Sequence, residues 1–203
     1  MGAARIGRAL AAVAVLVVGI WLLEVLDLVT GLRLDSYGIT PRRISELPDI
    51  FTAPFLHAGF GHVMANTVPL ALLGVFTALR GLARLAAVTL TVVVVGGLGV
   101  WLTAPSYTIT LGASILVFGY FGYLITCGFI EREAGDIAIA AVVAAIYGTM
   151  IFGVLPLYPG VSWQGHLFGL AGGVLAGWLL SRRGPASKQS PQRRSGQGYG
   201  YRP

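Results

Sequence analysis

Three side chains suited to acyl-transfer chemistry lie within otherwise apolar segments of this 203-residue chain: His62, Ser114 and His166. A serine hydroxyl can attack a carbonyl carbon when a neutral imidazole accepts its proton, and the imidazole can then return that proton to the leaving group. Polar side chains are costly in lipid and often mark function there. The combination indicates nucleophilic catalysis inside a membrane.

These three residues also share a calculated depth. Each is followed, sixteen to eighteen residues later, by the first charge at the far end of its segment: Arg80, Glu131 and Arg182. With a helical rise of about 1.5 Å per residue, each of the three lies roughly 24–27 Å along its helix from that charged residue. This depth is inside a hydrocarbon layer about 30 Å thick. We therefore expect them to form one layer near one face of the membrane.

Composition indicates an integral membrane protein. Of the residues, 56% are apolar and 11% are charged, and the mean hydropathy is +0.79, which leaves too little polar surface for a soluble domain of this size. We expect an all-α, polytopic bundle of six transmembrane helices in one domain over residues 1–181. The expected spans are Ala9–Val29, His57–Leu79, Leu82–Leu102, Leu111–Ile130, Ile137–Leu155 and Trp163–Leu180.

The first span has an alternative interpretation as a cleaved signal peptide, because Arg5 and Arg8 precede an apolar run. The sequence that follows, WLLEVLDLVTGL, offers no small-residue cleavage site. We therefore expect this segment to stay in the protein as a helix.

Charge distribution predicts the orientation in the plasma membrane. Alternate connections carry eleven Lys and Arg residues on the side of both termini and three on the other side (Arg33, Arg42 and Arg43). By the positive-inside rule both termini are cytoplasmic, so the polar layer lies in the outer part of the membrane. This bias explains most of the net charge of +6, and no nucleic-acid partner is expected.

Two further segments and the single cysteine have less specific interpretations. Residues 182–203 are rich in Gly, Ser, Pro, Gln and Arg, which predicts a disordered tail that contacts anionic lipid headgroups. The connection from Thr30 to Leu56 mixes apolar and charged residues, so it suits either the headgroup boundary or an ordinary solvated loop. Cys127 has no disulfide partner, and we expect a structural role for it.

The second span opens with HAGFGHVMAN, which places His62 and Asn66 four residues apart on one helix face. Both side chains can donate hydrogen bonds to an oxygen that becomes negative during acyl transfer. Ser114 lies near the amino end of its helix, where backbone N–H groups are unpaired and can serve the same purpose. Ordinary hydrogen bonding within and between helices remains the alternative for each residue.

Glycines recur at every fourth position of the last span: Gly165, Gly169, Gly173 and Gly177. Such a stripe allows close approach of another helix, and the fourth span has a comparable thin face. Close packing of these two spans would bring Ser114 and His166 together. Because no Asp or Glu shares their depth in the second, fourth, fifth or sixth span, we expect a catalytic dyad rather than a triad.

In its motifs the chain resembles the rhomboid intramembrane serine proteases of the minimal six-helix bacterial type. His57, His62 and Asn66 match the family's HxxxxHxxxN pattern, Gly112 and Ser114 match its GxSG motif, and His166 and Gly169 match its HxxGxxxG motif. The resemblance implies Ser114 and His166 as catalytic residues, with the oxyanion bound by His62, Asn66 and the Ser114 backbone amide. It also implies supporting roles for His57, Gly112, Phe118 and Gly169, transmembrane proteins as substrates, and no metal or organic cofactor.

The chain departs from the family pattern at two places. Ile115 replaces the last glycine of GxSG, and the Trp-Arg signature of the first outer connection is absent. Ile115 motivates an alternative function, that of a catalytically inactive rhomboid-like protein that binds transmembrane segments. A channel or transporter is disfavoured, because the polar layer occupies only the outer half of the spans.

Overall fold

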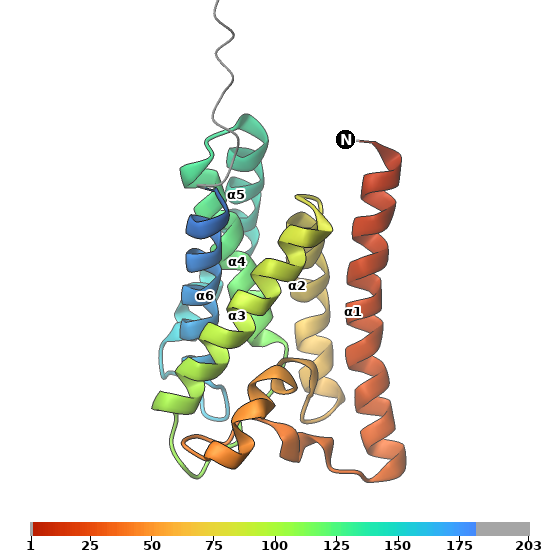
Figure 1. Ribbon diagram of the computed structural model, residues 1–203, viewed down its shortest axis with the longest axis vertical. Coiled ribbons are helices and arrows are strands. Elements are labelled where there is room, and N and C mark those ends of the chain that lie inside the picture. Colours follow the sequence, from red (N-terminus) through yellow and green to blue (C-terminus); the bar gives the residue numbers. More distant parts are fainter. Residues whose placement is uncertain (1, 182–203) are drawn as a thin grey trace, which may run out of the picture.

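The computed structural model describes residues 2–181, and within them all regular structure is helical apart from one isolated antiparallel bridge between Ile39 and Thr110. The expected all-α fold is confirmed, while the tail predicted over residues 182–203 lies outside the described residues. Six α-helices follow one another (Figure 1): α1 Ala3–Thr30, α2 Phe60–Ala78, α3 Leu82–Thr103, α4 Ser114–Ile130, α5 Ala134–Tyr147 and α6 Trp163–Ser181. Four 3-10 helices join them: η1 Leu34–Tyr37, η2 Ile44–Phe51, η3 Ala53–Phe55 and η4 Gly148–Val154.

Four helical segments of the described chain are long and apolar enough to cross a membrane: α1, α2, α3 and the stretch Ala134–Val154 that combines α5 with η4. Helix α4 is apolar but has only 17 residues. The chain is thus a multi-pass membrane protein, and the count of six spans stays a prediction. The start of α1 and the end of α6 lie at the same end of the bundle (Figure 1). Their cytoplasmic placement stays a prediction.

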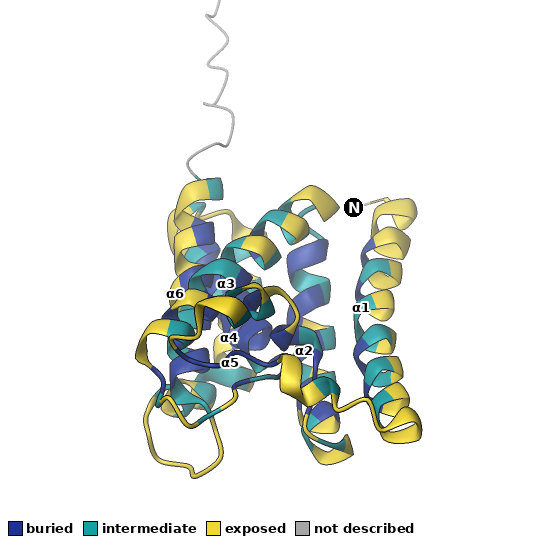
Figure 2. Ribbon diagram, turned by 60° about the horizontal axis from the view of Figure 1, so that its bottom comes forward, coloured by how far each residue is buried: buried dark blue, intermediate teal, exposed yellow. Residues whose placement is uncertain are grey.

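Helix α4 forms the centre of the bundle, and its residues from Ile115 to Leu124 are all buried. The buried residues gather on the inward faces of the helices, while α1 exposes its outward face (Figure 2). The glycine stripe of α6 makes the close contact with α4. A Cβ atom at Gly169 would lie 2.5 Å from the carbonyl oxygen of Ile115, and one at Gly173 would overlap the carbonyl oxygen of Gly119. The predicted packing of these two helices is therefore present.

The connection between α1 and α2 is packed against the bundle rather than free. Ile50 and Ala53 are buried, and a Cβ at Gly97 of α3 would lie 2.6 Å from Ile50 Cβ. The indole of Trp101 donates to the carbonyl of Arg43 (3.1 Å), and the Arg42 guanidinium donates to the carbonyl of Leu102 (3.2 Å). These contacts anchor the connection to the end of α3 without the family's Trp-Arg signature.

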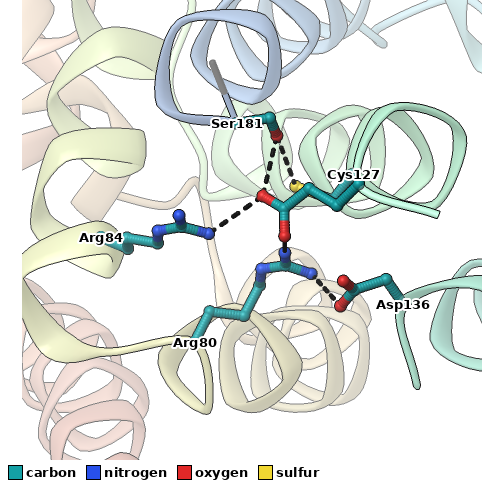
Figure 3. A network of polar contacts seen from close by, with 6 residues as sticks. Arg80, Arg84, Cys127, Asp136 and Ser181 are labelled. Carbon is teal, nitrogen blue, oxygen red and sulfur yellow. Dashed lines mark hydrogen bonds and ion pairs between the residues drawn. The ribbon is translucent and has the colours of Figure 1, made fainter. Parts of the chain in front are cut away.

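A cluster of charged residues joins several helix ends (Figure 3). It includes Glu131, which follows the end of α4 and so lies at the other end of that helix from Ser114. The Arg80 guanidinium pairs with Glu131 and, at 2.5 Å, with Asp136, while Arg84 donates to Glu131 at 3.2 Å. Ser181 also donates to Glu131 (2.9 Å). The cluster thus links the ends of α2, α4 and α6 to the starts of α3 and α5.

Cys127 lies beside this cluster, and its buried thiol is 3.8 Å from the Ser181 hydroxyl (Figure 3). Because it is buried beside a hydrogen-bonded cluster, the thiol is in a packing position, which agrees with the structural role expected for it.

Candidate active site

Ser114 is the first residue of α4, and the three backbone amides that lead into the helix have different partners. The Gly112 N–H donates to the carbonyl of Ala53 (2.9 Å), and the Ala113 N–H donates to His57 Nε2 (3.2 Å). The Ser114 N–H has no hydrogen-bond partner within the described chain. Of these three amides, that of the proposed nucleophile is the one left unpaired at the start of the helix, where it can bind a developing oxyanion.

His62 lies directly over Gly112. An ideal Cβ built on Gly112 would be 2.6 Å from His62 Cε1 and 2.7 Å from Nε2. The backbone φ of Gly112 is +121°, a conformation that residues with a side chain rarely adopt. Only glycine at this position gives both the turn before Ser114 and the close approach of the imidazole.

The tautomer of His62 is indicated by its other ring nitrogen. The Ala58 N–H points to His62 Nδ1 at 3.5 Å, a long contact in which Nδ1 accepts. If Nδ1 accepts, the proton of the neutral ring is on Nε2, which faces Gly112. His62 can then donate a hydrogen bond toward the region in front of Ser114.

Asn66 is buried one turn after His62, on the same face of α2. Its Nδ2 donates one hydrogen bond to the His62 carbonyl (3.0 Å), so part of the carboxamide is used within its own helix. The second N–H of the same group remains available for another acceptor.

His57 is buried, with 4% of its surface exposed, and its ring makes an edge contact with His62 at 5.0 Å between centroids. Because its Nε2 accepts from the Ala113 amide, it fixes the backbone immediately before Ser114. His57 thus contacts the turn that carries the serine, a position compatible with the supporting role that the resemblance implies for it.

His166, on α6, is held by contacts with α4 and η4. Its ring stacks on Phe118 of α4, with 4.1 Å between centroids and 10° between planes, and its Nδ1 lies 2.9 Å from the carbonyl oxygen of Gly153. Phe118 is four residues after Ser114, one helical turn along α4. The stack thus places the imidazole beside the start of α4.

The structure brings His57, His62, Gly112 and Asn66 together around the turn before Ser114, and it brings His166 to the neighbouring turn of α4. The Ser114 hydroxyl forms no hydrogen bond with His166 or with any other residue between 2 and 181. Catalytic hydrogen bonds are often long without substrate and shorten when substrate binds. The Ser114 and His166 pairing accordingly stays a prediction.

Ile115, which departs from the family motif, points away from this cluster. Its side chain is 1% exposed and faces glycines on two helices: a Cβ at Gly96 would lie 2.7 Å from Ile115 Cγ2, and one at Gly165 would lie 3.2 Å from Cγ1. The chain accommodates the larger residue with small ones across from it.

Two groups in this region give no signal in the sequence, because both are backbone carbonyls: those of Gly153 and Ala53. No side-chain motif reveals a carbonyl that faces a histidine or an amide. As for metals, the described part of the chain has no group of three His, Cys, Asp or Glu residues arranged to hold one.

Comparisons with known proteins fit this architecture. A family model described as "Rhomboid domain" matches residues 45–183. "Uncharacterized protein Rv1337" of Mycobacterium tuberculosis (strain ATCC 25618 / H37Rv) is 40% identical over 190 residues, which cover 90% of this chain and 78% of that protein. "Uncharacterized protein ML1171" of Mycobacterium leprae (strain TN) is 40% identical over 170 residues, 80% of this chain and 67% of that protein. "Putative rhomboid protease YdcA" of Bacillus subtilis (strain 168) is 30% identical over 163 residues, 77% and 76% of the two chains.

Proposed function

The chain belongs to the rhomboid family of intramembrane proteases, and on that premise we propose that it is a serine endopeptidase that cleaves transmembrane protein substrates. Ser114 is the nucleophile and His166 the general base. The free Ser114 amide is the observation that carries the proposal, because an unused N–H beside a hydroxyl at a helix start has a direct use in stabilising an oxyanion.

The reaction follows the chemistry of serine hydrolases. His166 accepts the Ser114 proton as Oγ bonds to the substrate carbonyl carbon, and the negative oxygen is bound by the Ser114 N–H, His62 and Asn66. The C–N bond then breaks, and His166 gives the proton to the leaving amine. Water hydrolyses the resulting ester by the same route, and the free serine returns.

The substrate and its membrane setting follow from the depth of the site. A fully hydrogen-bonded transmembrane helix presents no free carbonyl to a nucleophile, so the substrate must unwind locally. Cleavage near the outer face of the plasma membrane, with both termini of the enzyme in the cytoplasm, follows from the positive-inside distribution of charge. The protein requires no metal or organic cofactor for this reaction.

Labelling by a fluorophosphonate, which phosphonylates activated serines with loss of fluoride, tests the proposal. We expect detergent-solubilised protein to be labelled, Ser114→Ala to abolish labelling, and the exposed control Ser36→Ala to retain it. In liposomes the natural chain, but not Ser114→Ala, should cleave a tagged transmembrane segment that contains a Gly or Pro more readily than a polyleucine segment. Labelling that survives Ser114→Ala in folded protein would contradict the assignment.

The alternative function, a catalytically inactive protein that binds transmembrane segments, is motivated by Ile115 and by the missing Ser114 to His166 hydrogen bond. The position of Ile115, packed against Gly96 and Gly165, argues against this alternative. It would be favoured if folded protein captured transmembrane segments while remaining unlabelled and without cleavage.

A further inference from the structure

The hydrogen bond between His166 and Gly153 determines which ring nitrogen carries the proton. A backbone carbonyl can only accept, so at 2.9 Å the Nδ1 of His166 must be the donor. A neutral imidazole has one proton, and with that proton on Nδ1 the other nitrogen, Nε2, has a free lone pair. A base that is to take a proton from serine needs that lone pair.

No other group in the described part of the chain fixes which nitrogen of His166 carries the proton. No carboxylate contacts the His166 ring between residues 2 and 181, and the stack on Phe118 fixes the plane of the ring but not its tautomer. His166 is 8% exposed, so bulk water is not a ready substitute for the carbonyl. Removal of the Gly153 contact would leave both tautomers available.

We propose that the Gly153 carbonyl is a positioning group that holds His166 in the Nδ1–H tautomer, the part that an acidic side chain takes in a catalytic triad. This inference rests on the proposed function for its catalytic meaning. A neutral carbonyl suits the location, because a buried carboxylate would need its own compensating partners in an apolar layer.

The residue type at position 153 fits this role. A Cβ there would lie 2.9 Å from Phe118 Cζ and 3.1 Å from His166 Nδ1, so a side chain would push against both rings of the stack. Glycine lets the backbone approach the imidazole closely enough for the hydrogen bond. Gly148, in the same 3-10 helix, faces open space and supplies a matched control.

The tautomer can be observed without catalysis. The protonated and unprotonated nitrogens of an imidazole have widely separated 15N chemical shifts, so histidine-labelled protein reports where the proton is. The His166 signals are assigned by their loss in His166→Gln. We expect Nδ1 protonated and Nε2 unprotonated at neutral pH in the natural chain, and the same pattern in Ser114→Ala. A His166 ring protonated mainly on Nε2 in folded protein would overturn the inference.

This result is independent of whether the chain is a protease. Failure of Ser114-dependent labelling would contradict the proposed function but would leave the tautomer readable in the same sample. An Nε2–H tautomer together with normal labelling would overturn the role of Gly153 and leave the protease assignment intact.

The paired substitutions Gly153→Ala and Gly148→Ala test the catalytic consequence. We expect Gly153→Ala to give a mixture of His166 tautomers and to slow fluorophosphonate labelling on the order of tenfold, the scale of one lost hydrogen bond to a group that becomes charged. Gly148→Ala should change neither quantity. A folded Gly153→Ala protein with an unchanged tautomer and labelling rate would overturn the inference, and the 15N measurement on the natural chain decides it if this variant does not fold.

Discussion

The imidazole of His166 and the ring of Phe118 lie face to face, 4.1 Å apart and 10° from parallel. One residue belongs to α6 and the other to α4, so the contact joins the two helices that carry the proposed base and nucleophile. The orientation of the base therefore depends on a residue that itself has no chemistry to perform.

Phe118→Leu should show this dependence. Leucine preserves an apolar side chain but removes the flat surface, so the imidazole gains freedom and we expect labelling of Ser114 to slow by about tenfold. Phe121→Leu is the control, because Phe121 is also buried in α4 and makes no stack with a histidine. Labelling rates are measured on the folded fraction of each variant. Equal rates for the two variants would show that the stack does not orient the base.

Gly173→Ala should weaken the bundle itself. The added methyl group would overlap the Gly119 carbonyl and force α4 and α6 apart, and overpacking of this kind costs about 1–3 kcal/mol. We expect Tm in detergent to fall by roughly 3–10 °C. Gly19→Ala in α1 introduces the same methyl group with no atom within 4 Å, and its Tm should not fall. An unchanged Tm for Gly173→Ala would contradict the close packing of the two helices.

The helices themselves follow from the sequence to a large extent, because long apolar runs have few alternatives in a membrane protein. Helix α6 begins at the expected Trp163, and α3 begins at the expected Leu82. The expected fifth span, Ile137–Leu155, corresponds to the apolar stretch Ala134–Val154, in which an α-helix passes into the 3-10 helix Gly148–Val154. Hydropathy cannot distinguish these two helical forms, since both present the same apolar residues.

In the candidate site, the sequence predicted side chains but not the backbone groups that contact them. Spacing places His62 and Asn66 on one face, and the motif match includes Gly112 before Ser114. The contacts of Ala53, Gly153 and His57 with this site depend on how distant loops return to the bundle. Tertiary packing determines where these loops contact the bundle, so no local sequence pattern predicts the contacts.

Stability should depend on pH through Glu131. Burial of its carboxyl raises its pKa, but the Ser181 hydrogen bond and the guanidinium groups of Arg80 and Arg84 more than offset this, so the pKa lies below its ordinary value of 4.5. The unfolded chain then binds the proton first as pH falls, and the stabilisation by Glu131 is lost below about pH 4.5. We expect Tm to decrease across this range.

Glu131→Gln isolates this contribution. We expect the substitution to lower Tm at pH 7 by about 2–6 °C, equivalent to about 1–2 kcal/mol for a partly exposed ion-pair cluster, and to reduce the fall of Tm between about pH 5 and 3.5. The exposed neighbour Glu133→Gln serves as control and should leave both quantities as in the natural chain. An unaltered pH profile in Glu131→Gln would exclude this carboxylate as the titrating group.

Ile115→Gly restores the family's residue. It tests whether Ile115 is a replacement that the packing accommodates or one that impairs catalysis. Because Ile115 fills the space between Gly96 and Gly165, its removal opens a cavity, and we expect a loss of about 2–5 kcal/mol with no gain in the rate of Ser114 labelling. If Ile115 instead impaired catalysis, the rate of labelling would rise in Ile115→Gly. Gly96→Ala gives a second measure, since its methyl group would meet Ile115 Cγ2 at 2.7 Å in the natural chain but would partly fill the cavity in Ile115→Gly. We therefore expect Gly96→Ala to lower Tm in the natural chain and to raise it in the Ile115→Gly background, a coupling that a double-mutant cycle measures directly. Additive effects of the two substitutions would show that Ile115 and Gly96 do not share the space, and the case for Ile115 as a compensated replacement would fail.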